Sequence, residues 1–126
     1  MTNIKDLLST MDRVHAHERE LMVAKNHDYS GERDCLSNIK ACEVMEICDA
    51  ETGLLTRMLD KFQRIINLQK TKAMVKDESS LQDINDLRNY LVFLYHIKME
   101  KSDRERRERE DRAYDELQLK AASESP

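Results

Sequence analysis

The chain has 126 residues, enough for one domain with a single hydrophobic core. Charged residues make up 37% of it, and the net charge of −4 argues against a general affinity for nucleic acid or anionic membranes. With two glycines and one proline, the sequence holds few residues that break helices, so we predict an all-α fold.

The cysteines and the apolar runs indicate the compartment of the protein. Three cysteines occur without a CxxC pair, and an odd number fits a reducing cytoplasm better than a disulfide framework. The first residues lack the long apolar core of a signal peptide, and no run approaches the roughly 20 apolar residues that span a bilayer. We therefore expect a soluble, cytoplasmic protein that does not enter a membrane.

The first helix is predicted over residues 3–25, because apolar residues recur there at helical spacing and Asn3 or Thr2 can cap it. The polar segment at 26–34 then predicts a loop. Its beginning combines a cation, an amide and an aromatic ring, which suit a base or a sugar, although on their own they also fit an ordinary polar turn. The candidate nucleotide contacts here are Lys25, Asn26, Asp28 and Tyr29.

A short helix is predicted over residues 36–47, and a long one follows from Asp49, its N-cap, to about residue 72. Glu43 and Glu46 lie three residues apart on one side of the short helix, a spacing that two metal-binding carboxylates can use. Pairs of glutamates on amphipathic helices are usually at the surface, so both interpretations stay open.

The long helix carries cations that suit phosphate oxygens. Arg57, Asp60 and Arg64 share a face away from its apolar residues, so solvation alone also explains them. Lys61 is different, because at about 100° per residue it projects at the margin of the apolar arc. Its ammonium either bends back to solvent or enters a polar cleft.

The last core helix, predicted over residues 80–100, places two acids among its apolar residues. At about 100° per residue, Asp83 shares a sector with Tyr90, and Asp86 shares one with Phe93. Buried carboxylates are costly unless they are paired, hydrogen-bonded or bound to a metal. Acids at i and i+3 lie on one side of a helix, so this pair could hold one Mg²⁺.

Residues around this acid pair leave a second interpretation open. Ser80 and Asp83 have the spacing of a capping box, which by itself accounts for Asp83. Asp86 lies beyond the capping turn, and that role does not explain it. Asn89 adds a polar group near the same edge, and Glu78 is a further carboxylate just before the helix.

The segment at 101–126 mixes acids and bases throughout, which suits a solvated helix with i, i+4 ion pairs. Such a segment buries almost nothing. We predict a tail that is a helical extension, an oligomer contact or partly disordered.

Several segments together resemble the nucleotide-modification-associated domain one family, which is common in bacteriophages. They are KNHDY at 25–29, Asn38, GLLTRMLDKFQR at 53–64, Asn67 with Leu68, and the acidic block at 77–90. This family is similar to the all-α nucleoside triphosphate pyrophosphohydrolases, the MazG and dimeric dUTPase group. The resemblance covers residues 20–98 and leaves out the tail.

The resemblance implies a bundle of four to five helices over residues 1–100, usually assembled as a dimer or tetramer. It also implies Mg²⁺-dependent cleavage of nucleoside triphosphates between the α and β phosphates. On this reading acids hold Mg²⁺, cations neutralise phosphate charge, and polar and aromatic groups contact the base and sugar. The acids are Asp83 and Asp86 with Asp60 or Glu78. The cations are Arg57, Lys61 and Arg64, and the groups for base and sugar are Asn26, Tyr29 and Asn89.

The sequence departs from the pyrophosphohydrolases in one block. Asp83 and Asp86 stand where that group has ExxD, but its EExxE block is absent. Either the Glu43–Glu46 pair or the Arg57–Asp60 pair must take its place. Two other functions therefore stay open, a protein that holds a nucleotide without cleaving it, and a helical interaction protein. Since the amphipathic helices are long and aromatic residues few, we also expect subunits to bury apolar surface between them.

Overall fold

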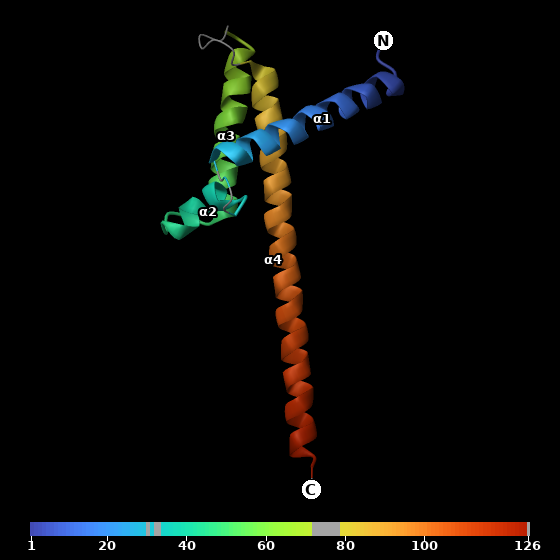
Figure 1. The fold of residues 1–126 in the computed structure, drawn as a ribbon, viewed down its shortest axis with the longest axis vertical. Helices are drawn as coiled ribbons and strands as arrows, with labels where there is room; N and C mark the ends of the chain where they lie inside the picture. Colours follow the sequence, from blue (N-terminus) through green and yellow to red (C-terminus); the bar gives the residue numbers. More distant parts are fainter. Residues whose placement is uncertain (30, 32–33, 72–78, 126) are drawn as a thin grey trace. The chain divides into compact units, whose positions relative to one another are not determined.

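The computed structural model describes residues 1–29, 31, 34–71 and 79–125. They form four α-helices and no strand, which confirms the all-α prediction (Figure 1). The chain divides into two compact units, Met1–Leu94 and Tyr95–Pro126. The helices are α1 (Ile4–Tyr29), α2 (Ser37–Val44), α3 (Ala50–Leu68) and α4 (Ser80–Ser123).

The first helix is longer than its sequence predicts. The backbone of α1 stays helical to Tyr29, so the loop expected from residue 26 is wrong over 26–29. At its start, Asn3 and Asp6 cap each other, each side chain accepting the other's backbone N–H at 3.0 and 3.2 Å. Just past its end, Gly31 adopts a left-handed φ of 57° and donates its N–H to the carbonyl of Asn26. The candidate contacts at 25–29 therefore project from a helix.

The short connection from α2 to α3 is fixed by two carboxylates. Asp49 accepts a hydrogen bond from the backbone N–H of Thr52 at 2.6 Å, which confirms it as the N-cap of α3. Glu43 accepts one from the backbone N–H of Ala50 at 2.7 Å. The two helices then pack so closely that a Cβ at Gly53 would lie 2.8 Å from the Sγ of Cys42, so a larger residue there would require the Cys42 side chain to move.

The first unit has a small apolar core. Its buried apolar residues come from α2, α3, the first part of α4 and the residue before α2, and they are Leu36, Ile39, Ala50, Leu54, Met58 and Leu87. Other apolar side chains of α3 are about half exposed: Leu55, Leu59, Phe62 and Ile66. A homo-oligomer could cover this outer stripe, and that assembly stays a prediction.

The first part of α4 lies beside α3, with α1 across them (Figure 1). The helix begins one residue away from the predicted cap, because the hydroxyl of Ser79 accepts from the backbone N–H of Gln82 at 3.4 Å. Ser80 is already helical, and the side chain of Asp83 is engaged elsewhere. The expected capping box is therefore wrong.

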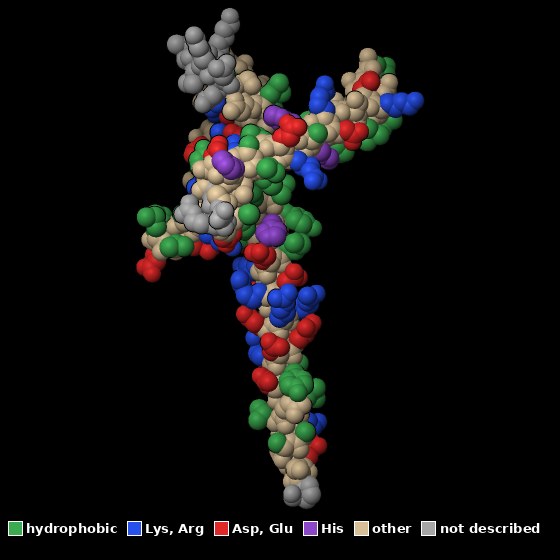
Figure 2. Space-filling model, viewed as in Figure 1, with side chains coloured by type: hydrophobic (Ala, Val, Ile, Leu, Met, Phe, Trp, Pro, Cys, Tyr) green, Lys and Arg blue, Asp and Glu red, His purple; other side chains and the backbone are tan. Residues whose placement is uncertain are grey.

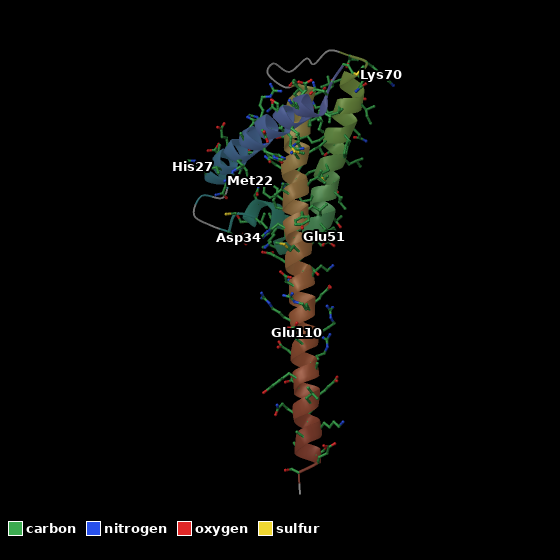
Figure 3. The ribbon with its side chains drawn as sticks, turned by 90° about the vertical axis from the view of Figure 1, so that its right-hand side faces the viewer. Met22, His27, Asp34, Glu51, Lys70 and Glu110 are labelled. Carbon is green, nitrogen blue, oxygen red and sulfur yellow. The ribbon has the colours of Figure 1, made fainter. Side chains whose placement is uncertain are left out.

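The second unit continues α4 to Ser123 as a helix, which agrees with the helical alternative for the tail. Acidic and basic side chains alternate over its surface (Figure 2). Figure 3 shows the side chains near Glu110 spreading outward around the helix. No residue described in this unit is buried. Across the described parts of the chain, no helix is long and apolar enough to cross a membrane.

Candidate functional site

Two buried carboxylates one helical turn apart form the centre of the site. Asp83 is fully buried and Asp86 is 6% exposed, both in the first part of α4. The structure thus confirms that this acid pair points into the fold, as the position of the pair within the apolar arc predicts. Because a buried charge is costly without partners, the next question is which groups neutralise them.

Three cations from two other helices meet the acid pair. Lys61 of α3 lies with its Nζ 2.9 Å from Oδ2 of Asp86 and 3.7 Å from Oδ1 of Asp83. Arg64, one turn later, donates from Nη1 to Oδ1 of Asp83 at 3.1 Å. Lys25 of α1 donates from Nζ to Oδ1 of Asp86 at 2.8 Å. We call these five residues the ion cluster: Lys25, Lys61, Arg64, Asp83 and Asp86.

The pairing between Asp86 and Lys61 favours the charged form of both groups. Burial works against the charge of Asp86, but hydrogen bonds and attraction from Lys25 and Lys61 outweigh it and lower the pKa of this carboxyl. Burial likewise works against the charge of Lys61, and the hydrogen bond and attraction of Asp86 outweigh it and raise the pKa of this ammonium. By formal charge, the ion cluster holds three basic and two acidic side chains, a net charge of +1.

A cavity of about 540 Å³ borders the ion cluster. All four helices contribute to it: the second half of α1, α2, α3 and the first part of α4. Its charged and amide-bearing residues are Lys25, Asn26, Asn38, Arg57, Asp86 and Asn89. Its apolar, aromatic and thiol residues are Met22, Val23, Tyr29, Cys35, Ile39, Tyr90 and Phe93.

The structure brings most of the predicted site residues together. Lys61 does turn its ammonium to the acids, which decides between the two alternatives for it. Arg64 is not on a solvated face, because its guanidinium binds Asp83 and its side chain is 27% exposed. Among the predicted nucleotide contacts, the cavity is lined by Lys25, Asn26, Tyr29, Arg57 and Asn89.

Other predicted residues lie apart from the cavity. Asp28 is exposed and pairs with its neighbour His27 at 3.2 Å. Asp60 is exposed and does not line the cavity. Glu43 binds the start of α3, and Glu46 is an exposed residue with a left-handed φ of 59° in the turn after α2. The proposed ligand Glu78 falls outside the described residues.

A second ion pair, of which only the carboxylate is buried, was not predicted from the sequence. Glu18 of α1 is 9% exposed, and Arg88 of α4 donates to it from Nη2 at 3.1 Å. The signal was available, because Glu18 falls four residues after Val14 and three before Leu21, within the apolar stripe of that helix. This pair ties α1 to α4 beside the cavity-lining Asn89.

Three of the four carboxylate oxygens in the ion cluster face cations, whereas Oδ2 of Asp83 is buried without a hydrogen-bond partner among the described residues. Magnesium takes six oxygen ligands at near-octahedral geometry. The three paired oxygens lie 2.8 to 3.1 Å from their cations, and the formal charge of the cluster is positive. No group of three potential metal ligands occurs among the residues described. An anion is the better complement to this charge.

Comparisons with known protein families, with curated proteins and with solved structures find no match to this chain.

Proposed function

We propose that the first unit binds a nucleotide in the cavity bordered by the ion cluster. The observation that carries this proposal is the combination of cations, amides and aromatic rings around one space of about 540 Å³. Ligand pockets of roughly 300 to 1,000 Å³ hold small molecules of this size. The chemistry of each part of the wall then indicates which part of a nucleotide it suits.

The cationic part of the wall suits phosphate. Arg57 is exposed and lines the cavity, and Lys25 lines it with its ammonium on Asp86. Guanidinium and ammonium groups bind phosphate oxygens through charge-assisted hydrogen bonds. Since Lys25 donates to Asp86, its ammonium is held in place at the cavity wall before a ligand arrives. Phosphate then meets one cation that is already positioned, with the exposed Arg57 nearby.

The aromatic part of the cavity wall suits the base of a nucleotide. Tyr29, Tyr90 and Phe93 line the same cavity, and aromatic rings stack on the flat faces of nucleobases. Amide side chains nearby offer both a donor and an acceptor to a base edge. A nucleotide satisfies the two halves of the wall at once, whereas free phosphate or a plain aromatic compound satisfies one.

The test is calorimetric titration of the full chain with dCTP, and with tripolyphosphate and deoxycytidine as its separate halves. We expect dCTP to bind more tightly than either half. Lys25→Met should weaken dCTP binding by tenfold or more, on the order of one charge-assisted hydrogen bond. The matched control is Lys70→Met, since Lys70 is exposed and does not line the cavity. Absence of binding by dCTP and by the other deoxynucleoside triphosphates, with and without Mg²⁺, contradicts the proposal.

A pyrophosphate assay on the same samples separates the two nucleotide functions. Release of pyrophosphate from dCTP with Mg²⁺, lost in Asp86→Asn, assigns the hydrolase activity that the family resemblance implies. Binding without release assigns a protein that holds its nucleotide. The positive charge of the ion cluster favours the second outcome.

A further inference from the structure

One cavity-lining side chain is buried without any hydrogen bond. Asn89 is 3% exposed, and both its Oδ1 and Nδ2 lack a partner among the described residues. Buried polar groups are nearly always paired, and an unpaired one costs about 1 to 3 kcal/mol. Leucine, of similar size, would avoid this cost. An amide kept at such a position indicates a partner that arrives with a ligand.

A second amide in the same wall shows the same deficit. Asn26 of α1 lines the cavity, and its Oδ1 is buried without a partner in the part of the chain that the structure describes. The two asparagines come from different helices and meet at one cavity. Together they lack three hydrogen bonds: two to carbonyl oxygens, which need donors, and one to an NH₂ group, which needs an acceptor.

Asn89 lines the cavity together with two aromatic residues of the same helix. It is three residues after Asp86 and four before Phe93, so all three lie on one side of α4, and Tyr90 follows it directly. All four line the cavity. The torsion that turns an asparagine amide has a broad energy profile, so a small rotation aligns it with a ligand. A base that stacks on one of these rings would therefore lie in the same cavity as the amide.

We infer that Asn89 and Asn26 select a nucleobase that carries an exocyclic amino group, an inference that rests on the proposed function. Two acceptors and one donor call for a base edge with two N–H bonds and one lone pair. Cytosine, adenine and guanine each provide this set. Uracil and thymine, when attached to a sugar, provide a single N–H and leave one amide oxygen unpaired.

The sharpest test compares dCTP with dUTP, which differ only at positions 3 and 4 of the ring. We expect the full chain to bind dCTP about tenfold more tightly, since one buried group left unpaired costs about that factor. Titrations are made in EDTA to prevent turnover, and are repeated with Mg²⁺ at a temperature where none occurs. Equal affinity for the two nucleotides overturns the inference.

The variant Asn89→Leu separates recognition from folding. Because it removes an unpaired buried amide, its thermal midpoint should equal or exceed that of the wild type, while the preference for dCTP over dUTP falls below about threefold. Affinity for tripolyphosphate should not change. The matched control is Asn85→Leu on the same helix, outside the cavity lining, which should keep the preference.

The outcomes distinguish this inference from the function on which it rests. Nucleotide binding without discrimination removes the role of the amides and leaves the proposed function intact. Loss of discrimination in Asn89→Leu together with a large fall in thermal midpoint marks Asn89 as structural, and the inference then fails. Asn26→Ala serves as the second variant and should reduce the preference for dCTP in the same direction. Failure of every nucleotide to bind overturns both proposals.

Discussion

In the first part of α4, residues 80–94, two aspartates and an asparagine are buried, whereas in the second part, residues 95–123, no described residue is. Both parts are helical and rich in polar groups. In the first, every buried charge meets a cation from α1 or α3. In the second, ion pairs form along the helix itself, such as Arg106 with Glu110 at 3.9 Å.

The comparison shows how position changes the value of the same chemical group. A buried carboxylate has strong electrostatic interactions and depends on its partners, so its loss is expensive. An exposed pair is screened by water and salt, and typically contributes about 0 to 1 kcal/mol. Substitutions of the same type in the two parts of α4 should therefore differ several-fold in effect.

The largest difference is expected for Asp86→Asn against Glu110→Gln. The first change removes the charge that Lys25 and Lys61 share, although Lys61 keeps Asp83 at 3.7 Å, and the loss of two charge-assisted hydrogen bonds should cost about 3 kcal/mol. The second removes one exposed, long contact and should cost less than about 0.5 kcal/mol. Urea denaturation followed by circular dichroism measures both. Similar shifts in the two midpoints contradict the burial of the ion cluster.

The apolar residues provide an independent version of the same comparison. Leu54 is 1% exposed in α3, and Leu54→Ala should destabilise the first unit by about 2 to 5 kcal/mol through lost burial and a cavity. Leu117 is 65% exposed, and Leu117→Ala should change stability by less than about 0.5 kcal/mol. The thermal unfolding midpoints of both variants measure this difference in stability. A marked loss of stability in Leu117→Ala shows that a second copy or a partner covers that side chain.

The inward direction of some site residues could be predicted from the sequence, because it follows from the helical spacing of apolar residues. Asp83 and Asp86 fall in the apolar arc of their helix, and Lys61 falls at the margin of its own. The same rule, applied to Glu18, predicts its burial as well. Periodicity gives the direction in which a side chain points from its own helix, and that is enough to identify these four.

The rest depends on contacts between helices, which one segment alone does not encode. Arg64 lies opposite the apolar stripe of α3, yet it is half-buried because α4 brings Asp83 to that side. Whether the amides of Asn26 and Asn89 have hydrogen-bond partners depends on the positions of all the side chains around them, and these positions come from the packing of several helices. The polar composition of residues 26–29 predicts a loop, whereas the structure keeps this segment helical and the N–H of Gly31 still binds the carbonyl of Asn26.

Lowering the pH should destabilise the first part of α4 more than the second, because the pKa of Asp86 is lowered in the folded chain. A carboxyl whose pKa is lower in the folded chain than its ordinary 3.8 stabilises the fold above that pH, and this contribution is lost as pH falls through the folded-state value. The free energy of unfolding should therefore fall below about pH 4 in the wild type, and less steeply in Asp86→Asn. Urea titrations from pH 6 to pH 2 measure the two slopes. Parallel curves show that Asp86 is not held ionised by Lys25 and Lys61.

The smallest expected effect concerns salt. The second part of α4 carries i, i+4 contacts such as His96 to Glu100 at 3.0 Å and Arg106 to Glu110 at 3.9 Å, each worth about 0.3 to 0.5 kcal/mol when charged. At 1 M salt the Debye length falls to about 3 Å, so the charge contribution of such exposed pairs should largely disappear. Glu110→Gln should then cost nothing measurable, whereas Asp86→Asn should keep most of its effect because its partners are half-buried. The comparison of the two variants in 0.05 M and 1 M NaCl measures this directly, and equal salt sensitivity contradicts the distinction between the two parts of the helix.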